Sequence, residues 1–260
     1  MEREVLGDLH LATKRLDGAP LVVFVHGVMD RGATFLGVTR RLPGASWIVY
    51  DRRGYGRSLT NTLPTFSDHV DDLVGIIDRE ATARPVSLVG HSLGGTIALA
   101  AASRRPNTVG SILVHEPPLP WLDWWPIRDE SGRRIEDDDV DTAVVRIMER
   151  LIGIDGWEAL TPAVKARHLA EGPTLVSELV TVRNGCPFDP ASLTMPFVAS
   201  RGSLSTGHRE RAQNWLLHTI PTASSFVVVG AGHNVQRSHP ETLSQRIEEQ
   251  LIGVHRRSIS

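Results

Sequence analysis

The chain has 260 residues, 41% of them hydrophobic and 22% charged, a composition typical of a soluble globular protein. Its net charge of −2 and the lack of a long basic run argue against nucleic-acid binding. The charged start MEREVLGDLHLATK lacks the apolar core of a signal peptide, and no apolar run is long enough to span a membrane. The single cysteine, Cys186, excludes an internal disulfide. We therefore expect a cytoplasmic protein. Three of the six tryptophans, Trp121, Trp124 and Trp125, lie unusually close together.

Short apolar runs bounded by Gly or Pro recur along the chain, at residues 21–25, 47–50, 86–89, 111–115, 196–200 and 225–229. Their hydrophobicity is continuous, which predicts strands buried on both faces of a sheet. Segments with helical periodicity lie between these runs, at residues 66–79, 93–103 and 242–252. This alternation predicts an α/β fold with a mostly parallel, doubly wound sheet.

The alternation stops between residues 117 and 194, where the pattern predicts helices at residues 140–152, 162–170 and 173–183. A long helical insert after a strand is typical of a cap over the sheet. We therefore expect a core domain of residues 1–116 and 195–260 and a helical cap, or lid, of residues 117–194. The acidic run at residues 136–139 lacks the ligand spacing of a calcium loop, so we expect no metal there.

A candidate nucleophile lies in the motif Gly90-His91-Ser92-Leu93-Gly94, between the strand at residues 86–89 and an Ala-rich helix. A chain that turns sharply from a strand into a helix strains the middle residue and needs small flanking residues. Such a turn raises the serine hydroxyl above the carboxyl edge of the sheet. Ser92 is therefore the predicted nucleophile, and the alternative is a tight turn with an incidental serine.

A serine nucleophile needs donors for the oxyanion that forms when it attacks a carbonyl. The segment His26-Gly27-Val28 directly follows the strand at residues 21–25, and we assign the oxyanion hole to the backbone N–H groups of Val28 and Leu93. Met29 and His91, which adjoin these two positions, are assigned to the substrate-binding wall.

Eleven histidines are available as the general base. His233 lies in the loop Gly230-Ala231-Gly232-His233-Asn234, directly after the last predicted strand and before the final helix. A loop at the carboxyl edge of the sheet can reach Ser92, so His233 is the predicted base.

Together these motifs resemble the α/β-hydrolase superfamily, as does the Asp-Arg-x-Gly-x-Gly-x-Ser pattern at residues 51–58. The resemblance implies the α/β-hydrolase fold, with a helical cap inserted after the sixth strand of the superfamily order, here residues 111–115. In most members the triad acid is an Asp that closes a Gly-x-x-Asp turn after the strand that follows the cap. Here that turn is Gly202-Ser203-Leu204-Ser205, and a serine cannot stabilise an imidazolium.

Glu116 is the substitute acid that the resemblance implies, because some branches, including certain dehalogenases and fungal lactonases, place the acid 24 residues beyond the nucleophile. We favour Glu116 over a purely structural role, and over Glu210 and Asp189. Short segments at residues 115–120, 156–160 and 238–240 resemble the zearalenone hydrolase group of lactonases.

The resemblance therefore implies a serine hydrolase that uses no cofactor or metal and cleaves a small-molecule carboxylic ester. The substrate we expect is a lactone or a bulky apolar or aromatic ester, and we expect a monomer or a homodimer. A carbon–carbon bond hydrolase, a perhydrolase, or a ligand-binding receptor with little turnover uses the same scaffold. The Trp121, Trp124 and Trp125 cluster follows Glu116 where the chain enters the cap, so it either contacts the substrate or packs the cap against the core.

Overall fold

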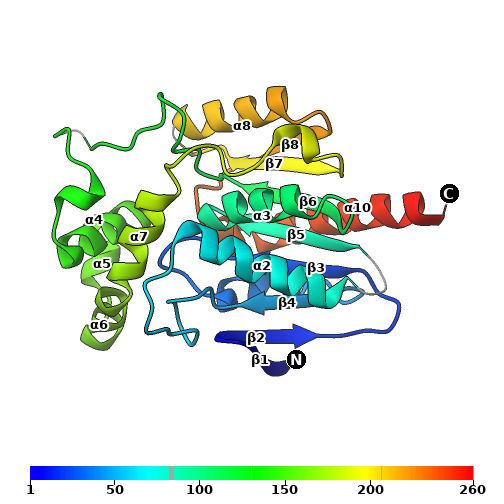
Figure 1. Ribbon diagram of the computed structural model, residues 1–260, viewed down its shortest axis with the longest axis horizontal. Helices are drawn as coiled ribbons and strands as arrows, with labels where there is room; N and C mark the ends of the chain where they lie inside the picture. Colours follow the sequence, from blue (N-terminus) through cyan, green and yellow to red (C-terminus); the bar gives the residue numbers. More distant parts are fainter. Residues whose placement is uncertain (82–84, 130, 206, 260) are drawn as a thin grey trace.

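A central sheet of eight strands, in the order β1-β2-β4-β3-β5-β6-β7-β8, organises the molecule (Figure 1). The computed structural model describes residues 1–81, 85–129, 131–205 and 207–259, the last six of these as backbone only. The strands are β1 (Glu2–Leu6), β2 (Leu9–Lys14), β3 (Leu21–Val25), β4 (Ser46–Tyr50), β5 (Val86–His91), β6 (Val109–His115), β7 (Phe197–Gly202) and β8 (Ala223–Val228). The strands from β3 to β8 pair in parallel, whereas β2 is antiparallel to β1 and β4. The predicted mostly parallel α/β sheet is thus confirmed.

Helices cover both faces of this sheet. The α-helices of the described residues are α1 (Leu36–Thr39), α2 (Phe66–Glu80), α3 (Leu93–Arg104), α4 (Val140–Ile152), α5 (Ile154–Glu158), α6 (Pro162–Ala170), α7 (Gly172–Thr181), α8 (Gly207–Thr219), α9 (Val235–Ser238) and α10 (Pro240–Ile259). Side chains of a strand alternate between the two faces, so Val23 of β3 joins the core beneath α2, α3 and α8, and Phe24 joins the core beneath α1 and α10. This two-sided burial explains the continuous apolar runs.

The two edges of the sheet depart from the sequence expectation. At one edge β1 and β2 form a hairpin that no apolar run predicted, because β1 is largely exposed and carries charged residues. At the other edge β8 is exposed along much of its length, and Val227 retains 41% of its accessible surface. An edge strand has a neighbour on one side only, so its apolar composition does not imply burial on both faces.

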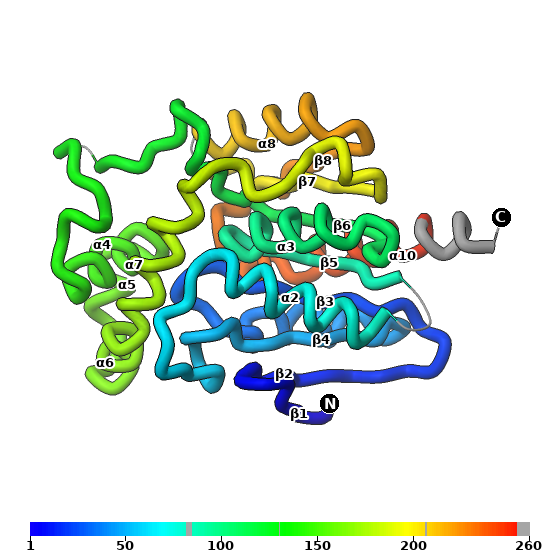
Figure 2. Tube along the Cα trace, in the orientation of Figure 1, coloured from blue at the N-terminus to red at the C-terminus, as the bar shows by residue number. Residues whose placement is uncertain are grey.

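Helices α4 to α7 gather beyond one end of the sheet, and Figure 2 shows the long connection that leads to them after β6. Asp139 caps α4 by accepting a hydrogen bond from the Thr142 N–H, and Thr161 caps α6 in the same way, with Pro162 at the first helical position. These helices lie within the stretch that the sequence assigns to a cap. The division into core and cap domains remains a prediction.

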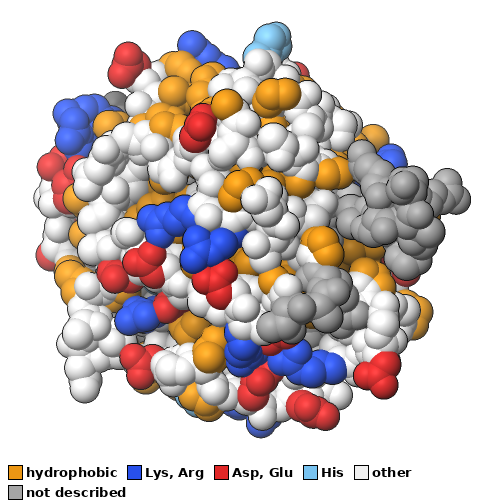
Figure 3. Space-filling model, turned by 45° about the vertical axis from the view of Figure 1, so that its right-hand side comes forward, with side chains coloured by type: hydrophobic (Ala, Val, Ile, Leu, Met, Phe, Trp, Pro, Cys, Tyr) orange, Lys and Arg blue, Asp and Glu red, His pale blue; other side chains and the backbone are white. Residues whose placement is uncertain are grey.

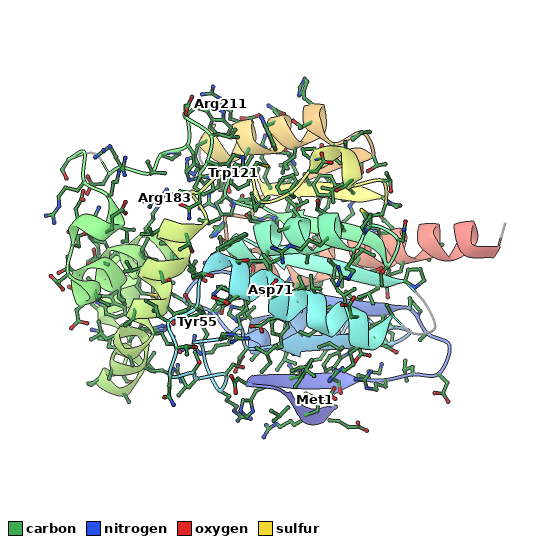
Figure 4. The ribbon with its side chains drawn as sticks, viewed as in Figure 1. Met1, Tyr55, Asp71, Trp121, Arg183 and Arg211 are labelled. Atoms are coloured by element: carbon green, nitrogen blue, oxygen red, sulfur yellow. The ribbon has the colours of Figure 1, made fainter. Side chains whose placement is uncertain are left out.

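A buried ion pair ties α7 to the core. Arg52, in the segment that follows β4, donates from Nη1 to Glu178 Oε2 at 2.6 Å, and both side chains are almost fully buried. The Tyr55 hydroxyl also donates to Glu178 (Figure 4 labels Tyr55 beside α7). On its other side Arg52 donates to the carbonyl oxygens of His26 and Gly27, at 3.0 and 3.1 Å. The pair therefore fixes the backbone just before Val28.

The surface carries charges of both signs. Figure 3 shows Lys and Arg side chains interspersed with Asp and Glu on one face of the molecule. In the part of the chain that the structure describes, no helix combines the length and the apolar character needed to cross a membrane.

Candidate active site

The turn between β5 and α3 raises Ser92 above the carboxyl edge of the sheet. Ser92 has φ 52° and ψ −130°, outside the ordinary range for a residue with a side chain. A Cβ on Gly90 would lie 2.5 Å from the Gly95 Cα, and one on Gly94 would lie 2.2 Å from the Val25 oxygen. The small residues are therefore required where the strand and helix pass each other, as the motif predicted.

Backbone strain is concentrated around this turn. Among the described residues, the only non-glycine residues with positive φ are Met29, Ser92 and Glu116, at 53°, 52° and 49°. Ser92 and Glu116 directly follow β5 and β6, and Met29 lies in the segment that follows β3 at the same edge. Conformations of this kind are held where the surrounding structure over-determines them, and they cluster at functional sites.

Glu116 and His233 lie together at this edge. The His233 Nδ1 atom is 2.7 Å from Glu116 Oε2, although 117 residues separate them in the chain. With the carboxylate ionised, Nδ1 carries the proton, which leaves Nε2 as the acceptor nitrogen. The Glu116 side chain is buried, and its backbone N–H donates to the Ser200 oxygen at 3.0 Å. This is the geometry of an acid that orients a histidine base.

Ser205 closes the turn where the α/β-hydrolase resemblance implies an Asp as the acid, and its hydroxyl donates to Glu116 Oε1. The Gly202 N–H donates to the same oxygen at 2.9 Å. The two possible acid positions are therefore adjacent, and a serine fits beside a glutamate where two carboxylates would repel.

Arg209 is a site residue that the sequence did not indicate. Its Nη1 atom donates to Glu116 Oε2 at 2.6 Å and also contacts His233 Nδ1. Burial alone raises the pKa of Glu116, but the hydrogen bond with His233 and the charge of Arg209 outweigh it and hold that pKa well below its usual range. Burial lowers the pKa of His233 well below its usual value, and the Arg209 charge acts in the same direction. The imidazole is thus neutral, as a base must be.

His91 supports the loop that carries His233. Its Nε2 atom is 2.8 Å from the backbone oxygen of His233, and the two rings lie 4.6 Å apart between centroids. Burial lowers the pKa of His91, so the ring is neutral and donates through Nε2. His91 therefore has a structural contact in addition to the predicted place on the substrate wall.

Ser92 and His233 line one cavity of about 240 Å³. One side of it is apolar and comes from the core, from helices α4 and α6 and from the turn before α6, through Val28, Met29, Met148, Leu151, Ile152, Leu160 and Val164. The rest of its wall is polar or charged and includes Asp30, Arg31, His91, Arg167, His168, Asn234 and Arg237. Within the described residues, neither the Val28 nor the Leu93 backbone N–H donates to a protein acceptor, so both are available to an oxyanion. No hydrogen bond between described residues joins Ser92 Oγ to the His233 ring.

A second cavity, of about 290 Å³, lies on the other side of α4 and is lined by Leu93 and Trp125. The other two tryptophans of the cluster have clear packing partners. Trp121 makes edge-to-face contacts with Phe188 and with Trp215, the latter on α8, and Figure 4 shows Trp121 beneath that helix. Trp124 packs against Trp125 and lies under the guanidinium of Arg211. These contacts favour packing for Trp121 and Trp124, and their part in substrate binding remains a prediction.

The rival acids have other partners. Glu210 accepts from Arg201 at 3.0 Å and is largely exposed, and Asp189 accepts from the Ala191 N–H at the start of a short 3₁₀ turn. Among the described residues, no group of three or more His, Cys, Asp or Glu side chains is arranged to hold a metal.

Comparison with known proteins places these features in context. The model of the alpha/beta hydrolase family matches residues 22–246. The lipase LipV of Mycobacterium tuberculosis is 29% identical over 179 residues, which cover 68% of this chain and 64% of LipV. A 2-(acetamidomethylene)succinate hydrolase of Mesorhizobium japonicum is 32% identical over 111 residues, 42% of this chain and 40% of that protein. The chain thus covers less than two thirds of the length of each of these relatives.

Among solved structures, a thermophilic esterase from Thermogutta terrifontis superimposes with a TM-score of 0.72 over 95% of this chain and 94% of that chain. Its sequence is 21% identical, so the likeness is one of fold. The fold that the motifs and the sheet order predict is thereby confirmed.

Proposed function

The chain belongs to the alpha/beta hydrolase family, and from that premise we propose that it is a serine hydrolase of small-molecule carboxylic esters that works without a cofactor. Ser92 is the nucleophile, His233 the base and Glu116 the acid. The observation that carries the proposal is the contact of Glu116 with both His233 and Ser205, because it accounts for the missing Asp. The lipase and esterase among the similar proteins support ester hydrolysis.

The proposed reaction proceeds through an acyl-enzyme. His233 Nε2 takes the hydroxyl proton of Ser92 as Oγ attacks the ester carbonyl, and the Val28 and Leu93 N–H groups bind the oxyanion. The proton then passes from His233 to the leaving alkoxide, which departs as the alcohol and leaves the acyl group on Ser92. Water repeats the sequence to release the acid, while Glu116 stabilises the imidazolium in both halves.

The cavity around Ser92 has an apolar side, which includes Met29, Met148 and Leu151, and this side supports an ester with an apolar group. We keep lactones within this proposal, including those of the zearalenone hydrolase group, because the acid position and three short segments resemble that group. A screen of chromogenic esters against aromatic and macrocyclic lactones decides between the two substrate classes.

The decisive experiment moves the carboxylate from the end of β6 to the turn after β7. We expect Ser92→Ala and Glu116→Gln each to lower kcat by about 10³-fold or more, whereas Asp189→Asn, the matched carboxylate control, keeps full activity. The double variant Glu116→Gln with Ser205→Asp returns a carboxylate to the usual family position and should regain part of the loss. An active Glu116→Gln enzyme would rule out Glu116 as the acid.

A receptor with low turnover is the second candidate, because Arg209 shares the Glu116 oxygen with His233 and no described hydrogen bond joins His233 to Ser92. A fluorophosphonate probe distinguishes the two candidates. Rapid labelling of Ser92 supports the hydrolase, and a folded protein that resists labelling supports the receptor.

A further inference from the structure

Two segments of the chain bring the proposed oxyanion donor and the proposed base to Ser92. The first follows β3 and carries Val28, and the second follows β8 and carries His233. The proposed reaction depends on the relative position of both groups, since a misplacement of about 1 Å can cost about 10²-fold in rate. A contact that holds the two segments together would therefore act on the reaction.

Asp30 connects these two segments. It lies two positions after Val28, and its side chain retains only 11% of its accessible surface. Its Oδ1 atom accepts from Arg237 Nη2 at 2.7 Å, and its Oδ2 atom accepts from Gln236 Nε2 at 3.4 Å. Both donors belong to α9, the helix that directly follows the loop of His233.

Gln236 extends this connection to His91. The Gln236 side chain is buried, and its Nε2 atom also lies 3.4 Å from His91 Nδ1. His91 donates through Nε2 to the His233 backbone oxygen, so its Nδ1 must accept, as must the Asp30 carboxylate. The two protons of the amide NH₂ group serve these two acceptors. Asp30 is therefore linked to the loop of His233 by two routes, one through α9 and one through His91.

The segment after β3 has a second attachment to α9 and a strained residue beside the first. The Thr34 hydroxyl, four residues beyond Asp30, accepts from Arg237 Nε at 3.0 Å. Met29, between Val28 and Asp30, has φ 53°, a conformation that persists only where the surrounding structure imposes it. The hydrogen bonds of Asp30 provide such a constraint on one side of Met29.

We propose that Asp30 is a positioning residue, which sets the distance between the proposed oxyanion donor Val28 and the proposed base His233. It acts through Gln236 and Arg237 and not on the reacting atoms. This inference rests on the proposed esterase function. The Arg237 guanidinium is largely exposed whereas Gln236 is buried, so we expect Gln236 to provide the larger share of the constraint.

Asp30 has two alternative roles. It is the one acidic residue among the described residues that line the Ser92 cavity, so it could contact the substrate directly. It could also serve the fold alone. The three roles predict different kinetics, because a substrate contact acts on KM, a positioning residue acts on kcat, and a purely structural residue acts on Tm without changing kcat.

Four variants test the proposal. Asp30→Asn keeps the size of the side chain and removes its charge, while Gln236→Leu and Arg237→Gln each remove a donor. The measured quantities are Tm, kcat and KM on para-nitrophenyl butyrate, and the inhibition constant of a trifluoromethyl ketone, which forms a tetrahedral oxyanion with a serine nucleophile. The control is Glu241→Gln, which breaks an exposed ion pair between α10 and Arg41, outside the Ser92 cavity.

We expect Asp30→Asn and Gln236→Leu each to lower kcat by about tenfold with KM nearly unchanged, and the ketone to bind more weakly by a similar factor. Arg237→Gln should have a smaller effect, of about twofold to threefold. Because Asp30 and Gln236 act through one contact, the variant that carries both substitutions should lose less than the product of the two single losses. Glu241→Gln should leave every quantity unchanged.

A rise in KM with unchanged kcat after Asp30→Asn assigns that residue to substrate binding, and a lower Tm with unchanged kcat assigns it to the fold. Either result overturns this inference and leaves the proposed function standing. If the wild-type protein neither hydrolyses the ester nor binds the ketone, the proposed function fails. Amide hydrogen exchange then decides the inference, since faster exchange in both residues 26–31 and residues 230–238 after Asp30→Asn supports it and a change in at most one of them refutes it.

Discussion

Replacement of Glu178 by Gln should strongly destabilise the protein. The carboxylate lies 2.6 Å from Arg52 Nη1 and 3.1 Å from His69 Nε2, and it accepts from the Tyr55 hydroxyl. Glutamine keeps the size of the side chain but not its charge, so Arg52 would remain buried without a counter-ion. The loss of one partner from a buried ion pair costs about 3–5 kcal/mol.

That cost is a large share of the whole, because domains are stable by only about 5–15 kcal/mol. At about 2–4 °C for each kcal/mol in a chain of this size, Tm should fall by roughly 6–20 °C. The effect should extend to activity, because Arg52 also holds the carbonyl oxygens of His26 and Gly27 ahead of Val28, the proposed oxyanion donor.

Urea unfolding and calorimetry of Glu178→Gln, with kcat on a chromogenic ester, measure both effects. Asp78→Asn is the control, since it breaks an exposed pair with Arg105 and should change little. The double variant Arg52→Met with Glu178→Leu removes both charges and should recover part of the stability, since the Tyr55 hydroxyl and the His26 and Gly27 carbonyls lose their partners. A Glu178→Gln variant within about 1 kcal/mol of the wild type, below the cost expected for a broken buried pair, would refute this reasoning.

Three further predictions concern pH and the backbone. Arg209→Gln removes a charge that lowers the pKa of His233, so the acid limb of the kcat/KM profile should move to higher pH, whereas Arg211→Gln on the same helix should leave that limb in place. Burial raises the pKa of Glu178, but the charge of Arg52 outweighs this effect and lowers that pKa from 4.5 to about 2. The stability that the ionised carboxylate provides is therefore complete above pH 4.5 and is lost as the pH falls toward 2, which urea titrations at a series of pH values should show. Gly94→Ala forces a Cβ to 2.2 Å from the Val25 oxygen and should prevent stable folding, whereas Gly75→Ala, where a Cβ meets nothing within 4 Å, should raise Tm slightly.

The positions of Ser92 and His233 could be predicted because each depends on a local pattern. Ser92 follows an apolar run and precedes a helix, and His233 follows the last strand between glycines, so each position depends on neighbours in the chain. The prediction of Glu116 as the acid depended on the family resemblance, because only the comparison showed that Ser205 stands where an Asp is expected.

Arg209 could not be predicted in the same way. It is one arginine in a polar helix, and its contact with Glu116 spans 93 residues. The two faces of α4 pose a similar difficulty. Periodicity predicts that Val144 and Met148 are buried, but it does not reveal that Arg150 lines a second cavity. Only the packing of the helix against the core decides that.

Backbone hydrogen bonds at the carboxyl edge of the sheet hold the turn after β5 and the turn after β6 together. Ser92 donates its N–H to the His115 oxygen, and the next residue, Glu116, donates its own to Ser200. The proposed nucleophile and the proposed acid therefore extend the ladder of β5, β6 and β7, and neither can shift without breaking these hydrogen bonds. Pro117 directly follows Glu116, so the connection to the helices begins next to a residue that this ladder holds. Movement of those helices would change the walls around the ester while the spacing of Ser92 and Glu116 stays constant.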